Sequence, residues 1–335
     1  MTAPAPRSAT CPALLIAAGA SGQGKTTVTA ALARLHARQG RRVRVFKCGP
    51  DYLDPYWHQL ASGAPVQNLD LWMTGWDDCA ARLHAAAQEA DLLLIEGVMG
   101  LFDGSDSVAD LAQRTGVAVL AVVDASAMGG TLGAIVHGLK TYRPGLPWAG
   151  VLANRVASPR HAQMLQDGLL AAPDWLGALP PLGGPGGTPL LPERHLGLVA
   201  AQELPDALQR LDAAADALAA TPLGQLDASA WQRWATPFAP PPPAAPLPPL
   251  LAGRTIAVAR DAAFHFIYPA NLRTLEQLGA QLVFFSPVAG DELPACDALW
   301  LPGGYPELHA PALAANERLR AQLHAHVQAG KPLWA

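Results

Sequence analysis

A glycine-rich loop near the N-terminus carries the residues best suited to chemistry. Residues 19–27 read GASGQGKTT and fit the pattern G-x-x-x-x-G-K-[ST]. In this pattern backbone N–H groups surround phosphates, the lysine (Lys25) reaches the terminal phosphates, and the next hydroxyl (Thr26) binds Mg²⁺. An apolar run at 13–18 precedes the loop and an Ala-rich helical pattern at 28–39 follows it. This flanking order disfavours a chance glycine turn, so the sequence predicts use of a nucleoside triphosphate.

Carboxylates follow two further strand-like runs. Glu96 comes directly after the apolar run 91–95, like a Walker B acid, and Asp103 lies in the glycine-flanked loop that follows. Asp51 comes after a Gly-Pro turn at the end of the expected strand 42–47. Acids at one edge of a sheet, beside a triphosphate, would bind one or two Mg²⁺ ions through oxygen ligands. Each acid singly could instead end a strand or cap a helix, an alternative that is less favoured for all three together.

Two other polar residues have less specific surroundings. Asn154 follows the expected strand 149–153, where its amide could read an adenine edge or serve equally well as a turn residue. His195 lies in the segment LPERHLG at 191–197. A lone histidine is usually structural, and contact with a substrate is the less favoured alternative.

The elements that would position these residues alternate between strand and helix. Apolar runs separated by helical patterns predict a parallel sheet covered on both faces, with the ligand site beyond the carboxyl ends of the strands. In the first part of the chain we expect strands at 42–47, 91–95, 117–123 and 149–153, helices at 80–90, 131–142 and 202–220, and a loop at 179–192.

A proline-rich stretch divides the chain. A length of 335 residues is typical of two domains. Residues 237–249 are too rich in proline to continue a helix or a central strand, and they favour an extended spacer. We therefore expect an α/β domain at 1–236, a linker at 237–250 and a second α/β pattern at 251–335. The second pattern has expected strands at 254–259, 281–285, 298–301 and 331–335, and helices at 271–279 and 316–330.

Composition excludes several classes of function. The net charge of −4 is unlike the basic surface of a nucleic-acid binder. No apolar run reaches the length of about 18 residues that spans a bilayer, and the first eleven residues lack the pattern of a signal peptide. The four cysteines have neither paired metal spacing nor the pattern of a disulfide framework. These features predict a cytoplasmic protein without nucleic-acid or membrane partners.

Several sequence segments together resemble the cobyrinate or hydrogenobyrinate a,c-diamide synthase family, and the resemblance spans nearly the whole chain. The matching words are FKCGPDYLDP at 46–55, NLD at 68–70 with WM at 72–73, EGVMGLFDG at 96–104, LPERHLGLV at 191–199, DAAFHF at 261–266, YPAN at 268–271 and PGGYPEL at 302–308.

The resemblance implies a first domain that is a P-loop, dethiobiotin synthetase-like amidoligase using ATP and Mg²⁺. It would phosphorylate the a and c acetate carboxylates of a corrin ring, and ammonia would displace the phosphate. Nucleotide binding would fall to Gly22, Gln23, Gly24, Lys25, Thr26, Thr27 and Asn154. Metal binding would fall to Thr26, Asp51 and Glu96, and catalysis to Lys25, Asp51, Glu96 and Asp103. Tyr52, Leu53 and His195 would face the corrin, and a homodimer is implied by the resemblance alone.

The second domain resembles the start of a class I glutaminase. In that family a cysteine nucleophile follows in a Glu-Cys-Gly-Gly turn, whereas this chain stops at Trp334-Ala335, and Cys296 is expected to be a packing or surface thiol. Gly303 and Gly304 match the oxyanion loop, with a tight turn requiring positive φ as the alternative. We therefore expect an incomplete glutaminase domain that cannot hydrolyse glutamine, so that the chain would use free ammonia. We also expect an open sheet edge and uncovered apolar surface.

Other functions fit parts of the pattern. A nickel-sirohydrochlorin a,c-diamide synthase and a cobyric acid synthase share the architecture, although the GGYPE word favours the a,c enzymes. A partitioning or regulatory P-loop ATPase is the alternative from another class. Such ATPases often carry a second lysine five residues before the loop lysine, where this chain has Ala20, which argues against them.

Overall fold

The computed structural model describes residues 8–183, 190–194, 197–199, 201–242 and 246–335. The chain divides into two compact units, residues 1–243 and 244–335, and the division falls inside the expected linker. His195 lies outside the described residues. Within them, no helix combines the length and apolarity needed to cross a membrane.

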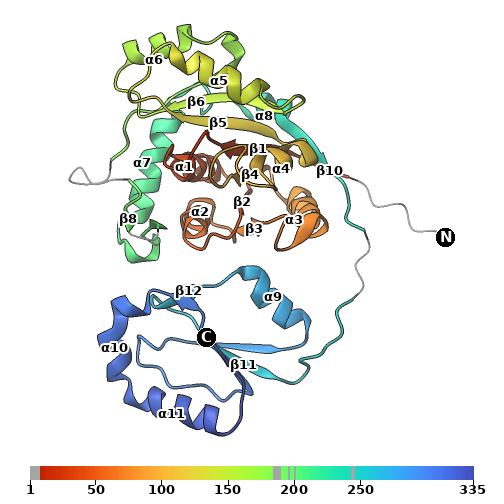
Figure 1. Ribbon diagram of the computed structural model, residues 1–335, viewed down its shortest axis with the longest axis vertical. Coiled ribbons are helices and arrows are strands. Elements are labelled where there is room, and N and C mark those ends of the chain that lie inside the picture. The colour runs from red at the N-terminus through yellow and green to blue at the C-terminus, as the bar shows by residue number, and fades with distance from the viewer. Residues whose placement is uncertain (1–7, 184–189, 195–196, 200, 243–245) are drawn as a thin grey trace, which may run out of the picture. The chain divides into compact units, whose positions relative to one another are not determined.

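The first unit is built on a parallel sheet with the strand order β3-β2-β4-β1-β5-β6-β7 (Figure 1). Its strands are β1 (Ala9–Ala17), β2 (Val43–Cys48), β3 (Gln67–Leu69), β4 (Leu92–Glu96), β5 (Ala118–Asp124), β6 (Trp148–Asn154) and β7 (Trp175–Ala178). The strands at 43–48, 92–96, 118–124 and 148–154 confirm the predicted alternation, because each overlaps an expected run almost completely.

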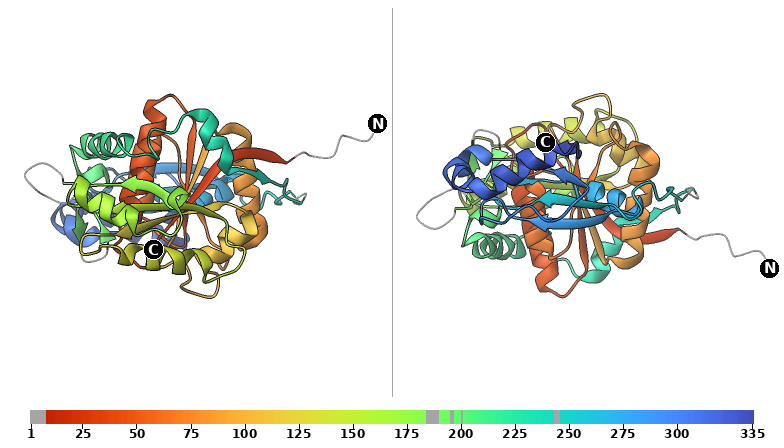
Figure 2. Two further views of the ribbon diagram at one scale, coloured as in Figure 1. Left: turned by 90° about the horizontal axis from the view of Figure 1, so that it is seen from above. Right: turned by 90° about the horizontal axis from the view of Figure 1, so that it is seen from below.

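Helices cover both faces of this sheet, as the two views of Figure 2 show. They are α1 (Lys25–Arg38), α2 (Asp54–Ser62), α3 (Gly75–Glu89), α4 (Val108–Thr115), α5 (Thr131–Thr141), α6 (Pro159–Asp167), α7 (Ala207–Ala219) and α8 (Ala228–Trp231). Helix α7 (green) lies beside α1 (red) in Figure 1 and in the left view of Figure 2.

The apolar strands have their residues buried on both sides. Along β1, Leu14 and Ile16 pack with Leu211 of α7 in one core cluster. Their neighbour Leu15 packs with Leu83 of α3 in another. Successive side chains of a strand point to opposite faces, so a continuous apolar run is what a sheet covered on both sides requires.

Two local expectations were wrong. The helix expected at 202–220 begins only at Ala207, because Pro205 disfavours helical backbone in the residue before it. Residues 54–62 form helix α2, a segment to which the sequence analysis assigned no element. Strand β10 (Ala235–Phe238) pairs antiparallel with the start of β1, so the first unit continues past the expected boundary at 236. Two short strands, β8 (Glu193–Arg194) and β9 (Gly197–Leu198), also pair in this unit.

The second unit has its own parallel sheet, ordered β13-β11-β14-β16. Its strands are β11 (Thr255–Ala259), β12 (Phe264–Phe266), β13 (Gln281–Phe285), β14 (Ala298–Trp300), β15 (Gly303–Gly304) and β16 (Leu333–Trp334), and its helices are α9 (Pro269–Gln277), α10 (Ala310–Ala315) and α11 (Glu317–Gln328). Strands β12 and β15 form a separate antiparallel pair. The edge strand β16 leaves Trp334 60% exposed, with its ring stacked on Trp300.

Candidate functional site

The glycine-rich loop joins β1 to α1 and ends where α1 begins, at Lys25. Gly22 and Gly24 have φ values of +76° and +98°, which favour glycine. A Cβ atom on Gly24 would lie only 2.2 Å from the Nδ2 atom of Asn154. The loop therefore keeps its backbone N–H groups at the N-terminus of a helix, an arrangement that binds anions such as phosphate.

Lys25 lies across this loop. Its Nζ atom donates to the carbonyl oxygens of Ala20, at 3.1 Å, and Met99, at 2.7 Å. Burial lowers the pKa of this ammonium, although nearby carboxylates oppose the effect. Met99 has a positive φ of 50°, uncommon for a residue with a side chain, and this backbone presents its carbonyl to Lys25.

Asp103 shapes the neighbouring loop. Its Oδ2 atom accepts a hydrogen bond from the backbone N–H of Gly100 at 2.8 Å. A Cβ atom on Gly100 would lie 2.7 Å from that same oxygen. Asp103 thus holds the segment that carries Met99, and it does not join the acids described next.

Glu96 lies at the centre of the site. It is fully buried at the end of β4, and its Oε1 atom accepts hydrogen bonds from Thr26 Oγ1 at 2.7 Å and from Lys47 Nζ at 3.0 Å. Its Oε2 atom contacts the Nε2 atom of His58, from α2. Burial alone would raise the pKa of this carboxyl, but Lys47 and His58 hold it below its usual range.

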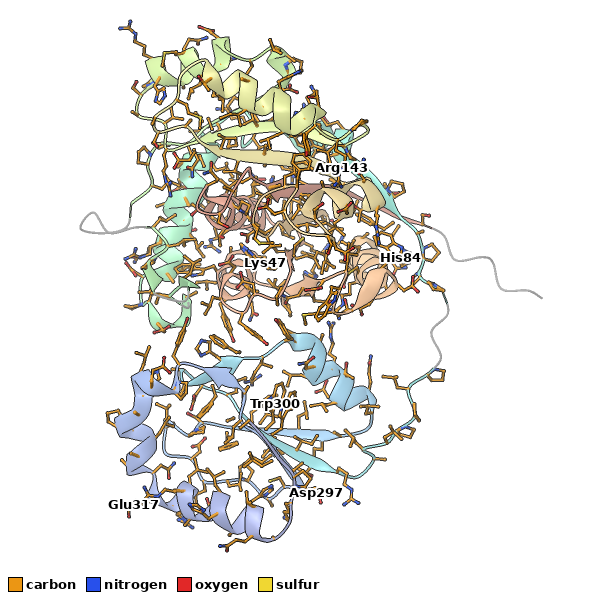
Figure 3. The ribbon with its side chains drawn as sticks, viewed as in Figure 1. Lys47, His84, Arg143, Asp297, Trp300 and Glu317 are labelled. Carbon is orange, nitrogen blue, oxygen red and sulfur yellow. The ribbon has the colours of Figure 1, made fainter. Side chains whose placement is uncertain are left out.

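Lys47, whose position in the first unit is labelled in Figure 3, is buried and surrounded by carboxylates. Its Nζ atom lies 2.5 Å from Asp54 Oδ2 and 3.3 Å from Asp51 Oδ2, in addition to its contact with Glu96. Burial would lower the pKa of this ammonium, but the attraction of Glu96, Asp54 and Asp51 raises it above its ordinary value. The three carboxylates therefore favour the charged form of this buried lysine.

Asp51 lies three residues before the start of helix α2. Its Oδ1 atom accepts hydrogen bonds from the backbone N–H groups of Leu53, at 2.9 Å, and Asp54, at 3.2 Å. Burial and the neighbouring Asp54 raise its pKa. Asn68, in the middle of β3, donates to the carbonyl oxygens of Gly49 and Asp51 and ties this turn to the sheet.

Asn154 supports the glycine-rich loop from the end of β6. Its Nδ2 atom donates to the carbonyl oxygen of Gln23 at 2.9 Å, and its Oδ1 atom accepts from the N–H of Arg155 at 3.0 Å. The Gln23 side chain accepts in turn from the N–H of Asp124 at 2.8 Å. These contacts fit a structural role for Asn154, and a contact with adenine stays a prediction.

A pocket of about 610 Å³ opens over these groups. Its lining includes Lys25, Thr26, Thr27, Lys47, Asp51, Asp54, Glu96, Asn154 and Arg155, with Leu182, Leu190, Leu191 and Leu198 adding apolar surface. Tyr52 is half-buried and Leu53 is only 6% exposed, and neither is among the described residues that line the pocket. The expectation that both face a ligand stays a prediction.

The donor set suits a hard divalent cation. The Thr26 hydroxyl and the Glu96 carboxylate lie 2.7 Å apart, and Asp54 Oδ2 lies 3.1 Å from the same hydroxyl. Oxygen ligands of this kind, completed by phosphate oxygens and water, are what Mg²⁺ takes. Within the described ranges, no group of three or more His, Cys, Asp or Glu side chains is arranged to hold a metal ion. The ion would therefore need ligands from phosphate and water as well.

Sequence reasoning missed three groups at this site, Lys47, Asp54 and His58. Asp54 and His58 are four residues apart on α2, so both face the end of β4. The sequence did contain a signal for this helix. In the spacing Asp-Pro-x-x-His, Pro55 is in the first turn, where proline favours the start of a helix.

In the second unit, Gly303 and Gly304 form β15 opposite β12. A Cβ atom on Gly304 would lie 2.0 Å from the carbonyl oxygen of Ala263, and neither glycine has a positive φ. The alternative of a turn requiring positive φ was therefore wrong, because close approach of two backbones explains why glycine is needed at 304.

All four cysteines are buried. Burial raises the pKa of each thiol, to about 11 for Cys11 and about 12 for Cys48. The Sγ atom of Cys296 lies 3.9 Å from Nδ1 of His326, but burial raises its pKa as well. Cys296 is a packing thiol, in accord with one of the two expectations.

Each of the two units matches a known protein family. Residues 14–181 match the family model described as the CobQ/CobB/MinD/ParA nucleotide binding domain, and residues 255–335 match the CobB/CobQ-like glutamine amidotransferase domain. The chain is 60% identical to a hydrogenobyrinate a,c-diamide synthase of Stutzerimonas stutzeri, over 98% of this chain and 74% of the relative. It is 57% identical to the protein of that name from Pseudomonas aeruginosa, over 98% and 73%. It is also 51% identical to a cobyrinate a,c-diamide synthase of Herminiimonas arsenicoxydans, over 94% and 70%.

Proposed function

We propose that this chain, which belongs to the hydrogenobyrinate and cobyrinate a,c-diamide synthase family, is an ATP-dependent ligase that amidates acetate carboxylates of a corrin ring. The observation that carries the proposal is the meeting of Lys25, Thr26, Lys47 and Glu96 in one pocket at the glycine-rich loop. In this proposal the reaction belongs to cobalamin biosynthesis.

A carboxylate is a poor electrophile, and phosphorylation gives it a leaving group. In our proposal the γ-phosphoryl group of ATP passes to an acetate oxygen, and ammonia then attacks the acyl phosphate and releases inorganic phosphate. When bound, Mg²⁺ supplies charge stabilisation for the transferring phosphoryl group. Thr26 and Glu96 would hold the ion, with Asp54 beside them.

The side chains of the pocket do the rest by position and charge. Lys25 would exchange its contacts with Ala20 and Met99 for the terminal phosphates. Lys47 lines the same pocket, so its positive charge would act on the phosphoryl group while its ammonium stays paired with the acids. Preorganised charge in a site shielded from water is usually the largest source of rate acceleration, so the phosphoryl step needs no dedicated acid or base.

Ammonia would come from glutamine in the complete amidotransferase reaction, in line with the family match of the second unit. For the 335-residue chain we propose that free ammonia is the nitrogen source, because none of its thiols is accessible or acidic enough to act as a nucleophile. The proposal also includes a homodimer and a cytoplasmic location, which follow from the family resemblance and from the pattern of cysteines.

The test is ATP turnover by the purified chain with Mg²⁺ and ammonium, with and without hydrogenobyrinate or cobyrinate, followed by mass spectrometry of the ring. The proposal expects ADP release that depends on the corrin, and a product with two amides. Lys25→Ala should reduce turnover by about 10²-fold or more. ATP turnover that does not depend on the corrin and is stimulated by protein or DNA would favour a regulatory ATPase. Amidation of nickel-sirohydrochlorin alone would show that the substrate is that tetrapyrrole.

A further inference from the structure

The Glu96 carboxylate is buried at the base of the pocket lining, and both of its oxygen atoms have partners. Oε1 accepts from Thr26 and Lys47, which both line the pocket at the glycine-rich loop. Oε2 meets the His58 ring on the opposite side. A buried carboxylate is stable only when its oxygens have partners, so the direction in which Oε1 faces depends on what binds Oε2.

His58 is built into the protein interior. Its side chain is fully buried, and its backbone carbonyl accepts a hydrogen bond from Ser62 Oγ at 2.8 Å. The preceding residue, Trp57, is anchored through an Nε1 hydrogen bond to the carbonyl oxygen of Val199 at 2.9 Å. The imidazole therefore has little freedom to move away from Glu96.

The two ring nitrogens of His58 differ. Nε2 contacts the carboxylate, whereas Nδ1 is buried and has no hydrogen-bond partner within the described part of the chain. A proton on Nδ1 would be a buried donor without an acceptor, which is costly. The ring therefore holds Glu96 through Nε2, which is the only one of its two nitrogens with a hydrogen-bond partner among the described residues.

We infer that His58 is a positioning residue that turns Oε1 of Glu96 toward Thr26 and so prepares the magnesium site. This inference rests on the proposed function, because it concerns the metal ion that accompanies the nucleotide. His58 contacts neither phosphate nor substrate in this role, and it acts through Glu96. Partners of this kind typically change metal affinity by about 10- to 100-fold.

The experiment measures nucleotide binding to the full chain by calorimetry, once with ATP and Mg²⁺ and once with ATP and EDTA. The quantity of interest is the gain in affinity that Mg²⁺ provides. His58→Leu removes the donor and should lose about tenfold or more of this gain, with the affinity in EDTA nearly unchanged. His58→Gln keeps an N–H at a similar reach and should retain most of the gain.

His84 provides a matched control. It is a buried histidine of α3 whose Nδ1 contacts the carbonyl oxygen of Phe238 at 2.9 Å, away from the pocket (Figure 3). His84→Gln should leave the magnesium-dependent gain as it is in the unchanged chain. If His58→Leu does not fold, His58→Asn replaces it, because its amide is too short to reach Glu96 and should lose the gain that His58→Gln retains.

Two results would overturn the role of His58 and leave the proposed function standing. They are a full magnesium-dependent gain in the variant that lacks the donor, and an equal loss of affinity with and without Mg²⁺. An unchanged chain that shows no magnesium-dependent gain at all would overturn the proposed function together with the role of His58.

Discussion

Lys47 and Glu96 are register partners on the neighbouring parallel strands β2 and β4, and their charged atoms lie 3.0 Å apart. The strand pairing therefore places a cation beside the central carboxylate without help from a loop. Asp54 and Asp51 complete the surroundings of the ammonium from the next turn of the chain. The positive charge of Lys47 balances acids that would otherwise repel one another in the interior.

Replacing Lys47 with methionine should damage both stability and catalysis. The change leaves three acids close together without their cation, and breaking a buried ion pair typically costs about 3–5 kcal/mol of unfolding free energy. Loss of a preorganised charge should reduce kcat by about 10²-fold or more. Denaturant unfolding and corrin-dependent ATP turnover measure the two effects.

Lys140→Met is the control for this change. Lys140 pairs with Asp174 at 2.9 Å, but its side chain is 37% exposed and does not line the pocket at the glycine-rich loop. We expect a loss of about 1 kcal/mol or less and unchanged turnover. Equal effects of the two substitutions would refute the special role of Lys47.

His36 should make the first unit sensitive to acid. Burial, followed by the nearby Arg41, lowers the pKa of this histidine from its ordinary 6.5 to about 4. Because the unfolded chain binds the proton more readily, stability is fully present above pH 6.5 and falls as the pH drops toward about 4. The loss should amount to roughly 3 kcal/mol at most.

Replacing His36 with phenylalanine keeps an aromatic ring against Trp231, which the histidine contacts edge-on at 4.6 Å. The variant should lose less stability than the unchanged chain between pH 6.5 and about 4. Unfolding free energies measured across that interval provide the comparison. Parallel curves for the two proteins would show that His36 does not contribute.

Trp72 should contribute to binding the macrocycle. It follows β3 at the carboxyl edge of the sheet and is 86% exposed, although Asp70 Oδ1 fixes its turn by accepting from the N–H groups of Trp72 and Met73. An exposed indole on a fixed turn of backbone is suited to packing on a large flat ring. Trp72→Ala should raise the KM for the corrin by about tenfold while leaving ATP affinity unchanged, an effect worth roughly 1.4 kcal/mol.

Leu170 is a suitable comparison for Trp72, because it is 80% exposed and lies between α6 and β7, away from the ends of the strands that form the pocket. Leu170→Ala should leave both constants unchanged. A KM for the corrin that does not respond to Trp72→Ala would remove this residue from the substrate surface.

Glutamine hydrolysis by the 335-residue chain should not rise above background. The nucleophile in such a reaction is a thiolate, whereas burial raises the pKa of Cys48 to about 12 and of Cys296 above its ordinary value. Glutamate release, measured with the corrin and ATP present, checks this. Activity that disappears in Cys296→Ser would assign a catalytic role to a thiol that we describe as a packing group.

The sequence predicted much of the sheet and the phosphate loop because both have strong local signals. Glycines before Lys25 and continuous apolar runs such as 92–95 need no knowledge of the rest of the chain. Helix α2 was missed because its nine residues begin after a Gly-Pro turn and carry mixed polar and aromatic side chains. Missing it meant missing Asp54 and His58.

The relation of Lys47 to Glu96 required the strand order. The sequence placed each residue at the end of a strand-like run, but only the pairing of β2 with β4 shows that they are neighbours. Asp103 illustrates the reverse case. Its position in a glycine-flanked loop favoured convergence with the other acids, whereas its carboxylate is bonded to the backbone of Gly100.

The most direct test of the central claim follows an oxygen atom. The acetate carboxylates of the corrin are labelled with ¹⁸O, and the chain is given Mg-ATP and ammonium. If the terminal phosphoryl group passes to the carboxylate, the inorganic phosphate released with each amide should carry ¹⁸O. Amide formation accompanied by unlabelled phosphate would contradict the account.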